Sequence, residues 1–140
     1  MTTAVAEGGC LCGAIRYRLT AQPRSTSLCH CRSCRLAAGA PSVAWVVLNA
    51  ADFHVAAGVP TEFRSSAGVV RTFCNRCGTP LTYQHVTELD RIDITTASLD
   101  SPDMFPPTRE IWLSHKISWE RANDALAQYP GSSRDATPAG

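Results

Sequence analysis

The chain has 140 residues, 44% apolar and 18% charged, which is long and apolar enough for one globular domain with its own core. Its net charge of +1 argues against nucleic-acid binding, and no stretch approaches the roughly 20 apolar residues of a membrane helix. The start, MTTAVAEGG, lacks the basic and apolar regions of a signal peptide, so we expect a cytoplasmic protein with reduced thiols.

Short strands dominate the predicted elements. Residues 14–20 alternate apolar and arginine side chains, as in a half-buried strand, whereas residues 42–48 (SVAWVVL) are almost continuously apolar, as in a strand buried on both faces. Residues 61–65 and 69–73 flank a Ser-Ala-Gly turn and predict a hairpin. Further strands are predicted, in chain order, over residues 81–84, 91–97 and 111–113.

Helices are expected in two places only. One is a short turn after Cys31, through Leu36 and Ala38, and the other is a segment from about Trp119 to Gln128. Residues 130–140 (PGSSRDATPAG) are small, polar and rich in Pro and Gly, which predicts a disordered tail. We therefore predict a mainly β fold with a single domain over residues 1–129.

Cysteines provide the strongest chemical signal in the sequence. They form three groups: C-x-C (Cys10 and Cys12), C-x-C-x-x-C (Cys29, Cys31 and Cys34) and C-x-x-C-G (Cys74 and Cys77). Seven is an odd number, and disulfides are rare in a reducing compartment. Buried free cysteines do not cluster at ligand spacings, and a redox C-x-x-C needs a βαβ context that is lacking here. The pattern favours zinc, which takes four ligands in a tetrahedron.

The first and last groups together supply four thiolates, which is a complete structural zinc site. Cys10, Cys12, Cys74 and Cys77 would join the start of the chain to its middle. Structural zinc contributes ~10–16 kcal/mol, whereas the net stability of a domain is ~5–15 kcal/mol. We therefore expect the fold to depend on this site.

The remaining group, Cys29, Cys31 and Cys34, cannot fill a tetrahedron alone. Three protein ligands plus an open position is the pattern of a catalytic zinc. Two alternatives stay open: a histidine closes this site, or both sites are structural and carry no chemistry. The candidate histidines are His30, His54, His85 and His115.

Charge is unevenly distributed along the chain. Residues 1–51 contain five arginines and one glutamate, whereas the remainder is slightly acidic. Such a distribution is typical of mixed, solvated surface charge, but it also fits a positive rim that attracts a small anionic ligand.

The order of the cysteine motifs resembles the glutathione-dependent formaldehyde-activating enzyme family, which includes the centromere protein V domain. The resemblance covers roughly residues 8 to 120 and extends beyond the cysteines. The similar segments are GGCLCGAIRYRL, CHCRSCRLAAGA, FHVAAGVPTEFRSSAGVVRTFCNRCGTPLTY, IDITTASLDSPDMFPP and IWLSHKISW.

This resemblance implies a small β-tent of short antiparallel strands with few helices. It also implies two zinc ions per chain, a structural one on the first and last cysteine groups and a catalytic one on the central group. The implied activity is that of a carbon–sulfur lyase, which forms S-hydroxymethylglutathione from glutathione and formaldehyde. Arg32 and Arg35 would hold the carboxylates of the peptide. The chain departs from the family at Glu110, where many members have a histidine, and His115 and Lys116 follow instead.

We therefore expect a zinc-dependent enzyme that acts on the adduct of a small-molecule thiol and an aldehyde, with no nucleic-acid or membrane partner. The alternative is a non-catalytic binding or interaction module in which zinc only holds the β scaffold together. A chromatin role, by analogy with the centromere member, is disfavoured by the near-neutral charge.

Overall fold

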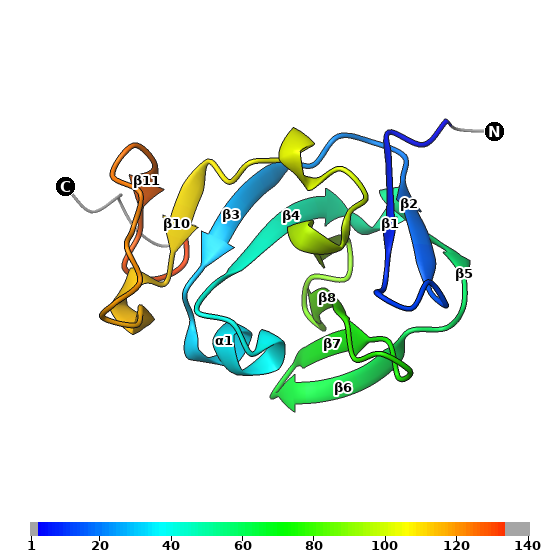
Figure 1. Cartoon of the computed structure of the whole chain (residues 1–140), viewed down its shortest axis with the longest axis horizontal. Helices are drawn as coiled ribbons and strands as arrows, with labels where there is room; N and C mark the ends of the chain where they lie inside the picture. Colours follow the sequence, from blue (N-terminus) through cyan, green and yellow to red (C-terminus); the bar gives the residue numbers. More distant parts are fainter. Residues whose placement is uncertain (1–2, 134–140) are drawn as a thin grey trace.

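The computed structural model in Figure 1 describes residues 3–133 and is mainly β, as predicted. Within these residues a three-stranded antiparallel sheet has the order β1 (Ala6–Gly9), β2 (Arg16–Leu19) and β5 (Phe53–Ala57). An eight-stranded sheet has the order β11 (Ala127–Gln128), β10 (Arg109–Ile111), β3 (Ser25–Cys29), β4 (Val43–Asn49), β9 (Arg91–Thr95), β8 (Pro80–His85), β7 (Val69–Phe73) and β6 (Thr61–Ser66). The small sheet lies at one end of the molecule and β10 and β11 lie at the other (Figure 1).

Strand β4 shows how the two faces of the large sheet are used. Its residues Val46 and Leu48 are fully buried in the main core, together with Leu19 from the small sheet. Trp45 alternates with them and packs on the opposite face, in a second cluster that contains Cys29. Both faces of β4 are therefore covered, which confirms the prediction from its continuous apolar run.

The strand pairing is antiparallel except at one end of the large sheet. Strand β10 lies parallel to both β3 and β11, whereas the other strand pairs of the described residues are antiparallel, as expected of the fold. The strand predicted over residues 111–113 is displaced toward the N-terminus, because Trp112 has a positive φ of 57° and a short 3-10 helix begins at Leu113. Strand β7 has the predicted bounds, and the remaining predicted strands are present with one or both ends shifted.

The helix predicted after Cys31 is confirmed as α1 (Arg32–Ala38), which ends at Gly39 with a φ of 62°. The other described helical segments are single 3-10 turns: Ala50–Asp52, Thr96–Ser98, Pro102–Met104 and Leu113–His115. Among residues 3–133, no helix has the length and hydropathy needed to cross a bilayer.

The second predicted helix, Trp119 to Gln128, is wrong. Side chains take up the backbone groups that a helix would use, since Lys116 Nζ donates to the Glu120 carbonyl and Glu110 accepts from the Asn123 amide. Asn123 then forms its own turn by accepting from the Ala125 amide. Only β11 is regular in this segment.

Part of the predicted tail, residues 134–140, lies outside the described residues. The first residues of the predicted tail, from Pro130, pack on the chain after β10, because the amides of Trp112 and Ser114 donate to the carbonyls of Gly131 and Pro130. The domain boundary at residue 129 stays a prediction.

Candidate functional site

The structure brings together the four cysteines of the first and last groups. Cys10 and Cys12 lie in the loop after β1, and Cys74 and Cys77 lie in the turn between β7 and β8. The Cys10 and Cys12 sulfurs are 3.6 Å apart, and the Cys12 and Cys74 sulfurs 3.8 Å apart. A zinc tetrahedron with Zn–S bonds of ~2.3 Å has sulfur–sulfur edges of about 3.8 Å. The spacing of these sulfurs therefore fits a zinc ion.

Backbone and hydroxyl donors surround this four-cysteine group. The Ile15 amide donates to Cys10 Sγ over 3.3 Å, and the Thr79 hydroxyl lies 3.2 Å from Cys77 Sγ. The hydrogen bond with Thr79 lowers the pKa of Cys77 to about 5. Gly78 has a φ of 82°, which is the conformation expected of a glycine after a C-x-x-C turn. These contacts favour the thiolate form that metal binding requires.

The central group is compact because it sits at a strand-to-helix junction. Cys29 ends β3, Cys31 is the N-cap of α1, and Cys34 lies in the first turn of the helix. The Cys34 amide donates to Cys31 Sγ over 3.3 Å. Cys29 and Cys34 are buried, whereas Cys31 is half-buried. Hydrogen bonds from the thiols of Cys29 and Cys34 lower the pKa of Cys31 to about 2, so this group carries a thiolate at neutral pH.

Arg71, to which the sequence analysis gave no role, contacts the three-cysteine group. Its two terminal nitrogens lie 3.8 and 3.7 Å from Cys34 Sγ, and its Nε donates to the Ser65 hydroxyl. Only 9% of Arg71 is exposed. A signal for it exists in the sequence, because an arginine two residues after Val69 in a strand shares the buried face of that valine. The buried guanidinium offsets part of the negative charge of the Cys31 thiolate.

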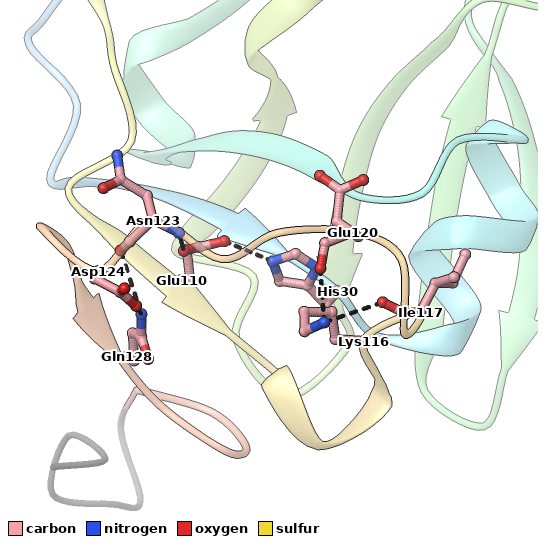
Figure 2. Close-up of polar contacts among 8 residues, drawn as sticks. All are labelled: His30, Glu110, Lys116, Ile117, Glu120, Asn123, Asp124 and Gln128. Carbon is pink, nitrogen blue, oxygen red and sulfur yellow. Dashed lines mark hydrogen bonds and ion pairs between the residues drawn. The ribbon is translucent and has the colours of Figure 1, made fainter.

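His30 points away from the cysteines on either side of it. Its ring is fully buried, and Nε2 lies 2.7 Å from Oε1 of Glu110 (Figure 2). Among the described residues, no His, Asp or Glu side chain joins either cysteine group at ligand distance. The structure thus brings none of the candidate histidines to the three-cysteine group, whose three cysteines all line the cavity described below.

Glu110 links this central loop to the C-terminal segment. Its second carboxylate oxygen accepts from the Asn123 amide, and nearby Lys116 donates to the carbonyls of Ile117 and Glu120 (Figure 2). Glu110 therefore lies in a buried hydrogen-bond network that supports the loop between Cys29 and Cys31.

A cavity of about 940 Å³ opens over the face of the large sheet that carries the three cysteines. Its wall includes both sulfur-bearing and aromatic side chains, among them Cys31, Trp45, Tyr83 and Trp112. The charged lining is more basic than acidic: Arg24, Arg32, Arg71, Arg91 and Arg109 face Glu88, Asp90 and Asp93. A small anion that also carries an amino group matches this lining.

Asp93 is a largely buried acid of this lining, with 13% of its side chain exposed. Its Oδ1 lies 3.3 Å from Nε of Arg91. Burial, with a smaller contribution from Glu88, raises the pKa of Asp93 to about 7, against the opposing effects of Arg24 and Arg71. The carboxyl therefore titrates near neutral pH.

The two arginines proposed from the resemblance lie differently. Arg32 lines the cavity next to Cys31, and its amide donates to Nδ1 of His115. Arg35 is not among the described residues that line the cavity, and its Nε is buried without a partner. A substrate role for either residue stays a prediction.

Comparison with known proteins identifies the family of this arrangement. The sequence profile described as "Glutathione-dependent formaldehyde-activating enzyme" matches residues 5–115. An uncharacterized lyase of Schizosaccharomyces pombe is 32% identical over 79 residues, which are 56% of this chain and 57% of the yeast protein. A Halomonas elongata protein, provisionally named a glutathione-dependent formaldehyde-activating enzyme, is 29% identical over 91% of this chain and 90% of its own.

The fold also has a counterpart among solved structures. A crystal structure of a Rhodobacter sphaeroides protein superimposes with a TM-score of 0.58 at 21% identity, covering 72% of this chain and 96% of that one. At this identity the similarity supports the fold alone.

Proposed function

Because this chain belongs to the glutathione-dependent formaldehyde-activating enzyme family, we propose that it is a zinc-dependent carbon–sulfur lyase that interconverts S-hydroxymethylglutathione with glutathione and formaldehyde. The proposal includes zinc at both cysteine groups and a reducing cytoplasmic location, where cysteines remain available to bind metal.

The observation that carries the proposal is the position of the three-cysteine group at the wall of a large charged cavity. Cys31 is half-buried there, and no fourth side chain completes the group within the described residues. Zinc bound to three cysteines has an open position, where it can hold a substrate thiol as thiolate. The four-cysteine group offers no such vacancy, so we assign it a structural role.

The charges that line the cavity complement those of glutathione. This tripeptide has two carboxylates and one amino group, and the cavity has basic side chains in excess of acidic ones. Among the basic residues that line the cavity, Arg32 is the one that directly follows Cys31, and it would orient one carboxylate. Asp93 is available to the amino group.

The direct test measures how fast glutathione and formaldehyde exchange with their adduct. Two-dimensional exchange NMR at equilibrium gives this rate without a coupled enzyme. We expect the zinc-loaded protein to accelerate the exchange and Cys31→Ser not to do so. A zinc-loaded protein that leaves the exchange rate at the uncatalysed value would instead support the non-catalytic module.

A further inference from the structure

Tyr83 places a phenol beside the three-cysteine group. It projects from β8, lines the cavity and packs against the cluster that contains Cys29, Cys34 and Trp45. Among the described residues of the cavity wall, Tyr83 is the only tyrosine. Its hydroxyl is therefore the one phenolic donor that this wall offers to a bound molecule.

Two contacts hold the ring of Tyr83 in place. The Arg71 guanidinium carbon lies 5.0 Å from the ring centroid, and the Trp45 ring lies 6.1 Å away at an angle of 60°. Arg71 also contacts Cys34 Sγ. The three residues are cross-strand neighbours or near-neighbours on one face of the sheet, so the position of the phenol is set relative to the sulfurs.

The hydroxyl of Tyr83 has no hydrogen-bond partner among the described residues, although the side chain is half-buried. Tyr17, in contrast, uses its hydroxyl in a 2.7 Å hydrogen bond with Ser98. Burial raises the pKa of Tyr83, with a further contribution from Asp93, so the hydroxyl stays protonated at neutral pH. A protonated hydroxyl without a protein partner is free to donate to a ligand.

We propose that Tyr83 donates a hydrogen bond to the aldehyde oxygen in the reaction assigned above, on which this inference rests. As the thiol sulfur forms the new C–S bond, the π electrons of the C=O bond move onto oxygen. The phenol stabilises the negative charge that develops there. The proton lost by the thiol is the proton gained by the product hydroxyl, so no further reagent is consumed. In the reverse direction the same hydrogen bond stabilises the oxygen as the C–S bond breaks.

The variant Tyr83→Phe tests this role, because phenylalanine keeps the packing on Arg71 and Trp45 and removes only the hydroxyl. Removal of one such donor typically lowers kcat by roughly 10²–10³-fold. We expect a loss of about this size in the exchange rate, an unchanged KM and an unchanged zinc content. Tyr129→Phe is the matched control, since Tyr129 does not line the cavity, and it should behave like the unmutated protein.

Three outcomes decide the matter. Unmutated protein that accelerates exchange while Tyr83→Phe does so equally well overturns the role of Tyr83 and leaves the proposed function standing. Unmutated protein without any acceleration overturns both. His115 is the rival donor in the cavity, and a loss in His115→Gln with full activity in Tyr83→Phe would transfer the role to it.

Discussion

Nε2 of His30 lies 2.7 Å from Oε1 of Glu110, and neither side chain is exposed to solvent. This contact joins the loop between Cys29 and Cys31 to β10, more than half the chain away. It explains why a histidine between two cysteines of the three-cysteine group does not itself join that group at ligand distance.

Replacing Glu110 should therefore destabilise the fold. Glu110→Ala leaves His30 Nε2 and the Asn123 amide without their buried partner, and losses of this kind cost ~3–5 kcal/mol. Urea unfolding at fixed zinc concentration measures the effect. Glu120→Ala is the control, because Glu120 contributes its backbone carbonyl to Lys116 and alanine keeps that group. Equal stability of the two variants would contradict a structural role for the His30–Glu110 pair.

The two cysteine groups should respond differently to serine. Cys74→Ser removes one ligand of a complete site, so we expect loss of one zinc and of the native circular dichroism spectrum. Cys31→Ser should retain the fold, because serine is itself a preferred N-cap and can accept from the Cys34 amide. Activity and the second zinc should be lost. A folded Cys74→Ser protein with full zinc content would contradict this division.

Arg71 should tune the affinity of the three-cysteine group for metal. Arg71→Met removes the guanidinium from Cys34 while keeping an apolar side chain in the buried position. Groups that contact metal ligands typically change affinity by roughly 10–100-fold. Competition with a zinc chelator should show one of the two zinc ions released more readily. Arg64→Met, on the exposed side of neighbouring β6, should release zinc like the unmutated protein.

Asp93 should make stability depend on pH near neutrality. The folded state holds its pKa at about 7, above the ordinary value of 3.8, so between these values the folded chain binds a proton that the unfolded chain has lost. The stability from this group is complete below pH ~4 and is lost as the pH rises through 7.

Asp93→Asn removes this titration. Relative to the unmutated protein, its free energy of unfolding should rise by about 1.4 kcal/mol between pH 6 and pH 8. Asp90→Asn provides the control, because Asp90 is exposed at the same cavity. A stability difference that stays constant across this range would refute the buried titration.

Local patterns predicted much of the fold. Alternation located β2, continuous apolarity located β4, and Gly68 marked the β6–β7 hairpin. Strands β1 and β3 were not predicted because their residues, AEGG and STSLC, are mostly small or polar. These segments become strands because they pair with neighbouring strands. The helix predicted near Asn123 does not form, because the side chains of Glu110 and Lys116 hydrogen-bond to backbone groups that a helix would use, the Asn123 amide and the Glu120 carbonyl.

The cysteine groups could be found from the sequence because metal ligands recur at short, regular spacings. The residues that line the cavity could not be found from the sequence. Arg71, Tyr83 and Asp93 stand side by side only through the register of β7, β8 and β9, in which each is the Cα partner of the next. The spacing of these three residues along the chain does not indicate that they are neighbours, so the row can be identified only once the pairing of the strands is known.

The contrast between the two cysteine groups also bears on how the protein acquires metal during synthesis. The C-x-C-x-x-C group spans only the junction between β3 and α1, so closing it around an ion costs little chain entropy, and its three cysteines leave the ribosome together. The other group joins cysteines 62 residues apart and must wait for Cys74 and Cys77. If both groups bind zinc as proposed, a nascent chain would load the three-cysteine group before the four-cysteine group, and zinc scarcity late in translation would leave the β1–β2 hairpin without its link to the β7–β8 turn.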